Sequence, residues 1–407
     1  MTAKPPPRQR RALTHIGGRI ELRGEPADAR VLERALVVHS DEAETRAHVH
    51  GFHAYTARMH PVTARRLVEA LSPPRATVLD PFCGSGTVLV EARLAGLRAI
   101  GIDANPLAVA LANLKTSSFP ERELERLVGE AERIAEEADA RRKAKAGATR
   151  NYGEPDRALF DAHVLFELDG LRAGIGRLPR SKVRDALWLA LSSILIKVSR
   201  SPGESGDAEA PRRLAGGFTL RMFRRRVEEL ARQLDAFARL VPRGVPPARA
   251  LVGDARSLDA VPSSSVDLVV TSPPYPGVYD YVAHHATRLR WLGFDARGFE
   301  GTEIGSRREL HRLGGRAVRR WKDDFGRVLG ALARVLAPGG SAVMLIADSA
   351  IGSSPILADE VGDELAGPAG LRLAAVASQA RPHFHGPTQV AFRARPRCEH
   401  ALLFRHA

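Results

Sequence analysis

The stretch Ala76-Thr-Val-Leu-Asp-Pro-Phe-Cys-Gly-Ser-Gly-Thr-Val-Leu-Val-Glu-Ala-Arg-Leu-Ala95 decides the fold of this chain. Its first five residues have the apolar pattern of a strand, the next seven form a glycine-rich turn, and the remainder has the pattern of a helix. Gly84 and Gly86 allow the backbone to approach a ligand closely, and the start of the helix offers free N–H groups. The pattern predicts a strand, turn and helix that carry a ligand at the carboxyl end of a parallel sheet.

A second short strand, Arg98 to Asp103, ends in a carboxylate about twenty residues beyond the turn. At this spacing a doubly wound sheet places an acidic side chain on ribose hydroxyls, although Asp103 alone would equally serve as a cap for the helix that begins at Pro106. The turn has no Gly-Lys-Ser/Thr ending and no third glycine, which disfavours a nucleotidase loop and a dinucleotide. The combination predicts a cofactor that contains a nucleoside.

A third feature is the turn Thr271-Ser-Pro-Pro-Tyr275, which follows the apolar run Val266 to Val270. Prolines fix the backbone and leave carbonyls without competing amide hydrogens. Such a turn can accept hydrogen bonds from a flat amino group while Tyr275 stacks on the ring that carries it. By itself the motif also fits a proline turn that caps a buried strand.

The two motifs Asp80-Pro-Phe-Cys-Gly-Ser-Gly-Thr87 and Thr271-Ser-Pro-Pro-Tyr275 together resemble those of the DNA amino-methyltransferases, and more narrowly the cytosine-N4 branch. The resemblance covers most of residues 48–119 and 248–407. It implies an α/β, Rossmann-like S-adenosylmethionine-dependent methyltransferase fold with an inserted helical subdomain. Adenine-N6 members more often carry Asp or Asn at the position of Ser272, so the serine favours cytosine and leaves adenine open.

Further segments resemble the same family in the same order. The stretch His50 to Pro61 resembles the segment that closes over the methionine end of S-adenosylmethionine, and Leu251 to Ala255 resembles the strand whose final acid, here Asp254, reaches the adenine amino group. The cofactor contacts implied by the resemblance are Tyr55, Thr56, Asp80, Pro81, Phe82, Cys83, Gly84, Ser85, Gly86, Thr87, Asp103, Ala104, Asp254, Ala255 and Thr271.

The catalytic residues implied are Ser272, Pro273, Pro274 and Tyr275. The target base leaves the double-stranded stack, because its amine cannot meet a sulfonium methyl group from inside the helix. The Ser272 hydroxyl and the Pro273 carbonyl accept hydrogen bonds from the amine and aim its lone pair. Methylation of a carbon through a thiolate is disfavoured, because neither Cys83 nor Cys398 follows a proline.

Changes of composition divide the chain into four parts. We expect a flexible basic N-terminal tail at 1–40, the cofactor half of the methyltransferase domain at 41–119, a helical insertion at 120–247 and the catalytic half at 248–407. The insertion contains helical patterns near 121–146, 186–198 and 220–240 and a polar loop near 201–211. It either selects the DNA target or serves as a lid or oligomer contact.

The net charge of +14 favours a polyanionic partner, although a GC-rich genome would produce the same excess of arginine. Candidate phosphate contacts are Arg288, Arg290, Arg307 and Arg395. The two cysteines indicate a reducing compartment, so we expect a cytoplasmic, nucleoid-associated protein without a membrane span. The group His383, His385, Cys398 and His400 lacks metal-ligand spacing, and no metal is expected.

The sequence therefore predicts a cytosine-N4 methyltransferase that acts on double-stranded DNA, with a cognate restriction enzyme as a conceivable partner and with the oligomeric state undefined. Three alternatives stay open: an adenine-N6 DNA methyltransferase, an RNA guanine-N2 or adenine-N6 methyltransferase, and a nucleic-acid-binding protein without catalytic activity.

Overall fold

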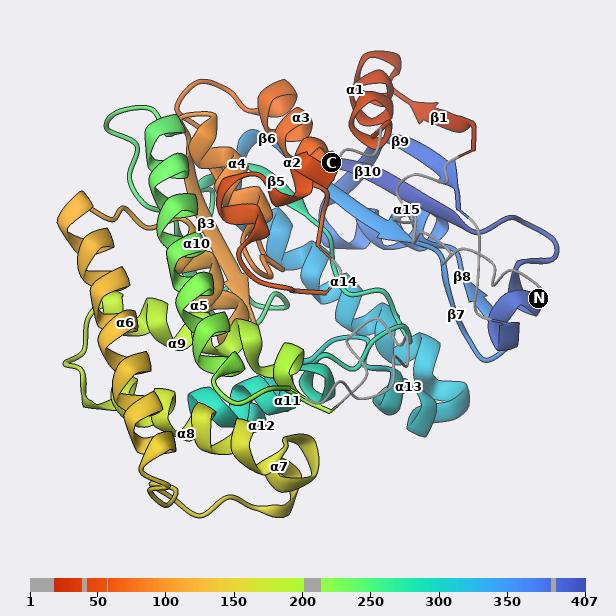
Figure 1. The fold of residues 1–407 in the computed structure, drawn as a ribbon. Helices are drawn as coiled ribbons and strands as arrows, with labels where there is room; N and C mark the ends of the chain where they lie inside the picture. The colour runs from red at the N-terminus through yellow and green to blue at the C-terminus, as the bar shows by residue number, and fades with distance from the viewer. Residues whose placement is uncertain (1–17, 39–41, 57, 201–213, 382–385) are drawn as a thin grey trace, which may run out of the picture.

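The computed structural model describes residues 18–38, 42–56, 58–200, 214–381 and 386–407. Its centre is a sheet of eight strands in the order β1-β9-β10-β6-β5-β2-β3-β4 (Figure 1). The strands are β1 (Ile20–Gly24), β2 (Thr77–Asp80), β3 (Arg98–Asp103), β4 (Arg249–Val252), β5 (Val266–Thr271), β6 (Leu336–Ala347), β9 (Leu371–Ala380) and β10 (Cys398–His406). A separate two-stranded sheet consists of β7 (Ser349–Ile351) and β8 (Ser354–Ile356).

The half of the sheet that carries the predicted motifs is parallel. Strand β2 pairs in parallel with β3 on one side and with β5 on the other, while β5 pairs in parallel with β6. Strands β10, β9 and β1 complete the other half through antiparallel pairs. The predicted Rossmann-like α/β fold is confirmed, and its parallel strands end at one edge, where ligands bind in such sheets.

Helices cover both faces of the sheet. Helices α1 (Pro26–Leu36), α3 (Pro61–Leu71), α4 (Thr87–Leu94) and α5 (Pro106–Lys115) contribute to a buried layer on one face, and α14 (Ala317–Val335) and α15 (Ala358–Ala366) contribute to the layer on the other. The strands β2 and β5 are apolar on both sides because both faces are buried. Shorter helices are α2 (Glu42–Arg46), α11 (Tyr281–Leu292), α12 (Ala296–Thr302) and α13 (Arg307–Leu313).

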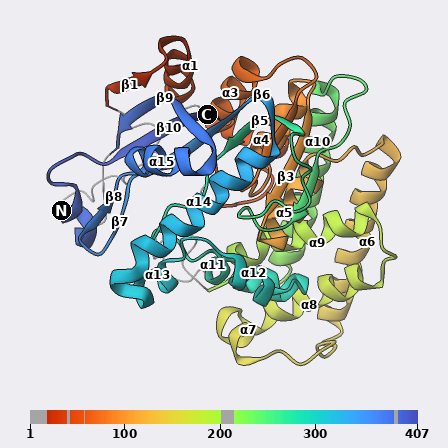
Figure 2. The ribbon, with the colours of Figure 1, turned by 180° about the vertical axis from the view of Figure 1, so that it is seen from behind.

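Between α5 and β4 the chain forms five α-helices and no strand within the described residues. They are α6 (Glu121–Lys143), α7 (Glu154–Leu159), α8 (Ala162–Arg177), α9 (Lys182–Leu195) and α10 (Phe218–Leu240). They gather beyond the β3–β4 end of the sheet, away from β1 and β9, in both views (Figures 1 and 2). The helix expected near 121–146 is present as α6, and it is amphipathic, because Leu127 and Ile134 are buried in the core of this helical unit. Most of the expected polar loop near 201–211 lies outside the described residues.

The expectation of a flexible tail at 1–40 is wrong for the part that the structure describes. Strand β1 pairs with β9 along its whole length, and α1 buries Leu32 completely against the sheet. Strand β1 is mostly exposed, and the polar residues around it produce a tail-like composition. The segment is ordered because it supplies the edge of the sheet and the apolar stripe of α1.

Within the described residues, no helix combines the length and the apolar character needed to cross a membrane.

Candidate active site

The two motifs of the sequence meet where β2 and β5 end side by side. The hydroxyl of Thr271 donates a hydrogen bond of 2.7 Å to Oδ1 of Asp80, which also accepts the N–H of Phe82 at 3.1 Å. Both Thr271 and Asp80 are buried. Burial raises the pKa of the Asp80 carboxyl to about 7, against the lowering effect of these two hydrogen bonds. The contact fixes the glycine-rich turn relative to the Ser-Pro-Pro-Tyr turn.

Asp103 holds the glycine-rich turn from the next strand. Its Oδ2 accepts the N–H of Gly84 at 2.8 Å and its Oδ1 accepts the N–H of Asn105 at 2.8 Å. Burial raises the pKa of Asp103 to about 6, although both hydrogen bonds lower it. The carboxylate therefore lies at the carboxyl end of β3, beside the turn, as its spacing predicts.

Glycine is required at two positions of the turn. Gly84 and Gly86 have φ angles of +49° and +87°, which disfavour residues with a Cβ. A Cβ on Gly84 would lie 3.3 Å from the ring of Tyr55, and one on Gly86 would lie 3.0 Å from Ala112. The turn thus approaches Tyr55 on one side and the α5 helix on the other.

Tyr55 belongs to a segment that crosses the turn and is fixed by α11. Its ring stacks on His285 with centroids 4.9 Å apart, and its hydroxyl accepts a hydrogen bond of 3.2 Å from Asn105 Nδ2. The neighbouring Thr56 hydroxyl is 2.7 Å from His284 Nε2. The neighbouring histidines His284 and His285 thereby hold this segment over the glycine-rich turn.

Two cavities open at this edge of the sheet, and the Ser-Pro-Pro-Tyr turn separates them. The first cavity lies over the glycine-rich turn and the second lies on the far side of the proline turn; Ser272 and Tyr281 line both. The first cavity is lined by Tyr55, Thr56, Pro81, Phe82, Gly84, Asp103, Ala104, Gly253, Ala255, Ser272, Pro274, Tyr281, Phe299, Thr302, Glu303 and Ile304. The second contains Ser272, Pro273, Tyr275, Leu345, Arg381, Arg397 and Glu399, together with side chains from 36–63 and 278–281.

The residues predicted to contact a cofactor divide into two groups. Eight line the first cavity: Tyr55, Thr56, Pro81, Phe82, Gly84, Asp103, Ala104 and Ala255. Six others do not line it and are buried in and beneath the turns: Asp80, Cys83, Ser85, Gly86, Thr87 and Thr271. These six support the turns instead of forming the surface of the cavity.

Asp254 does not line the first cavity, although Gly253 and Ala255 on either side of it do. Arg256 binds both of its oxygens, with Nη2 at 2.7 Å from Oδ2 and Nε at 3.0 Å from Oδ1. Burial raises the pKa of Asp254, but these hydrogen bonds outweigh it and the pKa is lowered. The carboxylate expected to reach an adenine amino group is instead turned toward Arg256.

Sequence reasoning missed one wall of the first cavity and one support beneath it. The wall is formed by Phe299, Thr302, Glu303 and Ile304, at and after the end of α12, in a region without a motif. The support is Lys115, a fully buried lysine whose Nζ donates to Ser85 Oγ at 3.0 Å. Burial lowers the pKa of Lys115 well below the usual value. A lysine at the end of an apolar helix was the only signal in the sequence.

In the second cavity, a chain of hydrogen bonds extends from the proline turn. The Tyr275 hydroxyl donates to Glu399 Oε1 at 3.3 Å, and Arg381 Nη2 binds Glu399 Oε2 at 2.9 Å. Burial, followed by the charge of Glu399, raises the pKa of Tyr275. The tyrosine hydroxyl is therefore neutral and its ring is fixed from the strand β10.

The chain resembles known proteins over part of its length. Residues 30–114 match the DNA methylase family of N6 and N4 methyltransferases. This match includes β2, the glycine-rich turn and β3. The type II methyltransferase M.MvaI of Kocuria varians is 26% identical over 267 residues, which are 61% of this chain and 58% of that protein. The type II methyltransferase M.MjaII of Methanocaldococcus jannaschii is 31% identical over 87 residues, 21% of this chain and 16% of that protein.

A tRNA (guanine(10)-N2)-dimethyltransferase of Methanothermobacter thermautotrophicus is 42% identical over 80 residues, which are 19% of this chain and 23% of that protein. The chain thus spans less than two thirds of the length of the curated relatives that it matches. Among solved structures, the rRNA methyltransferase aviRa of Streptomyces viridochromogenes superimposes with a TM-score of 0.36 at 13% identity, covering 91% of this chain and 94% of that one.

The four arginines predicted to bind phosphate differ in their surroundings. The prediction is wrong for Arg288, which is only 2% exposed beside the stacked Tyr55–His285 pair and cannot reach a DNA backbone. Arg290 is paired with Asp156 at 2.6 Å, and Arg395 is paired with Asp359 at 2.8 Å. The side chain of Arg307 is 65% exposed although it lies near Asp280. Of the four, Arg307 has the exposure that a phosphate contact requires.

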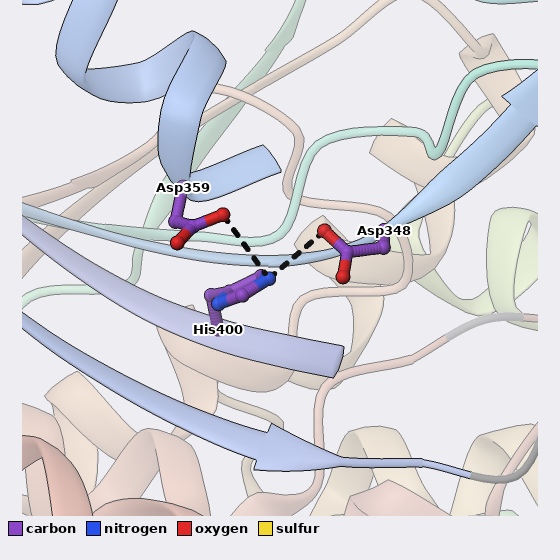
Figure 3. Close-up of side chains that lie close together, drawn as sticks. All are labelled: Asp348, Asp359 and His400. Carbon is purple, nitrogen blue, oxygen red and sulfur yellow. Dashed lines mark hydrogen bonds and ion pairs between the residues drawn. The ribbon is translucent and has the colours of Figure 1, made fainter. Parts of the chain in front are cut away.

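The chain also contains a buried group with metal-type donors, formed by Asp348, Asp359 and His400 (Figure 3). His400 Nε2 lies 2.9 Å from Asp348 Oδ1 and 3.8 Å from Asp359 Oδ1. Asp348 Oδ1 also accepts the N–H of Ala358, and Arg395 neutralises Asp359. The group ties the end of β6 to β10 and to the start of α15. His383 and His385 belong to the sequence group for which no metal was expected, and they lie outside the described residues.

Proposed function

We propose that this chain transfers a methyl group from S-adenosylmethionine to the exocyclic N4 amine of cytosine in double-stranded DNA. The observation that carries the proposal is the pair of cavities that meet at Ser272, one over the glycine-rich turn and one beyond the proline turn. A reaction between a cofactor and a base requires two sites that meet at one point. The match of residues 30–114 to the DNA methylase family supports the same conclusion.

The first cavity fits the cofactor. Gly84, with its positive φ, lets the turn approach Tyr55 closely, and both residues line the cavity, while Phe82 and Ala255 offer apolar surface. Asp103 provides a half-buried carboxylate beside the turn for ribose hydroxyls. When bound, S-adenosylmethionine supplies a methyl group on a positively charged sulfur. Within this chain, the glycine-rich turn, Asp103 and the Tyr55 segment would hold it.

The second cavity would hold the target base. The Ser272 hydroxyl and the Pro273 carbonyl accept hydrogen bonds from its amine, and Tyr275 stacks on its ring. These contacts draw the nitrogen lone pair out of conjugation and orient it toward the first cavity. The amine proton becomes acidic only as the new N–C bond forms and the S–C bond breaks, so it can leave to solvent water and no strong base is required at Ser272. Positioning and a carbonyl-rich environment supply the catalysis.

Cytosine is favoured over adenine because Ser272 resembles the cytosine-N4 branch, whereas adenine-N6 members more often carry Asp or Asn at this position. DNA is favoured by the net charge of +14 and by the match of residues 30–114 to the DNA methylase family. The target base leaves the duplex to enter the second cavity.

Nucleoside mass spectrometry tests the proposal. Unmodified DNA and RNA are each incubated with the protein and isotope-labelled S-adenosylmethionine, and their nucleosides are then quantified. We expect labelled N4-methylcytosine from DNA. Labelled N6-methyladenine would show that the base assignment is wrong, and a labelled N2-methylguanine from RNA would support the reaction of the archaeal tRNA enzyme instead. The Ser272→Ala protein is the control for background methylation.

A further inference from the structure

The second cavity ends in three charged side chains opposite the proline turn: Arg381, Arg397 and Glu399. They come from the ends of β9 and β10 and from the segment just before β10. The glycine-rich turn and the Ser-Pro-Pro-Tyr turn do not include them, and the proposed reaction assigns them no role. Their place at the far end of the cavity raises the question of which part of a base they contact.

The sheet fixes the direction of Glu399. Side chains alternate along β10, so Glu399 shares a face with Ala401, which is buried with Leu345 on the α1–α3 side of the sheet. His400 points to the opposite face, where Asp348 and Asp359 hold it (Figure 3). The buried cluster of Asp348, Asp359 and His400 therefore anchors the start of β10 on one face of the sheet. The Glu399 side chain lies on the other face, toward the second cavity.

The two arginines are held in different ways. Arg381 is 6% exposed and binds Glu399 through Nε at 3.0 Å and Nη2 at 2.9 Å, so it balances the charge of that carboxylate. Arg397 donates through Nε to the carbonyl of Asp348 at 2.8 Å. This bond fixes the guanidinium at its stem. Within the described part of the chain, the two terminal nitrogens of Arg397 have no hydrogen-bond acceptor.

The end of the cavity is therefore rich in donors, and the bases differ in how they match it. Beside its amine, cytosine presents two acceptors on the same edge, ring N3 and then O2. Adenine presents one acceptor there, followed by a C–H group. Guanine presents an N–H donor beside its N2 amine, which an arginine would repel. The planar fork of a guanidinium matches two neighbouring acceptors.

We propose that Arg397 is a specificity-determining residue that donates hydrogen bonds to N3 and O2 of the target cytosine while Ser272 and Pro273 hold the amine. This inference rests on the proposed function. Arg381 and Glu399 position Tyr275 against the ring through the chain of hydrogen bonds described above. The pocket selects a cytosine by reading its whole amine-bearing edge.

The first experiment compares Arg397→Met with Arg393→Met. Arg393 is exposed, lies four residues away and does not line the cavity, so its variant has the same loss of charge. On unmodified DNA with saturating S-adenosylmethionine, we expect Arg397→Met to form N4-methylcytosine about tenfold to a hundredfold more slowly than Arg393→Met. Cofactor affinity and the thermal midpoint, measured on both proteins, check that the first cavity and the fold are intact. Arg397→Lys should recover part of the rate.

The second experiment separates recognition from a structural role. Sequencing of the methylated DNA identifies the target site, and a duplex is made with 3-deazacytosine at that position, which lacks the N3 acceptor. The wild-type protein should lose rate on this duplex, whereas Arg397→Met should lose little more than it has already lost. Equal losses for both proteins would overturn the inference, as would equal rates of Arg397→Met and Arg393→Met on ordinary DNA. After either of these outcomes, formation of N4-methylcytosine by the wild-type protein would still support the proposed function. Formation of N6-methyladenine alone would overturn both the proposed function and the role of Arg397.

Discussion

The hydroxyl of Thr271 donates a hydrogen bond of 2.7 Å to a carboxylate oxygen of Asp80, across 191 positions of sequence. Thr271 ends β5 immediately before the proline turn, and Asp80 ends β2 immediately before the glycine-rich turn. Because both residues are buried, the bond is shielded from water. It couples the surface proposed for the cofactor to the surface proposed for the amine.

Replacement of Thr271 by valine tests that coupling. Valine keeps the shape of threonine but removes the donor, so Asp80 loses a partner in a buried site. We expect the free energy of unfolding to fall by about 1–3 kcal/mol, as measured by denaturant titration. Thr302→Val is a matched control, because that hydroxyl bonds only to the carbonyls of its own helix. An unchanged stability in Thr271→Val would mean that the bond contributes nothing net.

The Ser272→Ala and Tyr275→Ala variants test the amine site. Within the described residues, no hydrogen bond joins Ser272 or Tyr275 to the glycine-rich turn. The affinity of each variant for the cofactor should therefore stay within about twofold of the wild-type value. Methylation should fall by about a hundredfold or more, because the amine loses an acceptor or the base loses its stacking surface. Single-turnover kinetics measure the methylation rate of each protein, and a cofactor titration measures its affinity. A variant that methylates DNA at the parent rate would remove that residue from the proposed site.

The residues that the sequence located correctly are those whose environment is local. The glycine-rich turn and Asp103 follow from a strand, a positive-φ turn and a fixed spacing, and the structure joins them by the Gly84–Asp103 hydrogen bond. Thr271 and the proline turn follow from a buried strand with a stiff end. These features require only short stretches of chain and the rule that parallel strands end together.

The residues that the sequence misplaced depend on distant partners. Arg288 was expected at the surface, but it lies on the face of α11 that packs inward, and the weak amphipathic pattern of that helix does not reveal this face. The carboxylate of Asp254 was expected in the cavity, but Arg256, which bridges it to Asp324, turns it away. Glu399 and Arg381 became neighbours of Tyr275 only through the antiparallel pairing of β9 and β10.

Asp103 predicts the pH dependence of cofactor binding. Burial raises its pKa to about 6, so the carboxylate that would accept ribose hydroxyls is lost as the pH falls through this value. We expect the affinity for S-adenosylhomocysteine to rise between pH 5 and pH 7 and to level off above that range, as measured by calorimetry. Below the pKa the change should approach tenfold per pH unit.

The Asp103→Asn protein is the control for that titration, because Asp80 has a pKa raised to about 7 and titrates in an overlapping range. The variant should bind more weakly at pH 8 and show a much flatter profile. If its profile keeps the full slope of the wild type, the titrating group is not Asp103.

Leu32 tests the corrected role of the N-terminal segment. It is fully buried between α1 and the sheet, so Leu32→Ala should leave a cavity and lower the free energy of unfolding by about 2–5 kcal/mol. Arg30→Ala, at an exposed position of the same helix, should change stability by less than about 0.5 kcal/mol. Urea titrations of the two proteins give the comparison. Equal stabilities would restore the interpretation of residues 18–38 as a tail, since a segment that does not pack cannot lose packing energy.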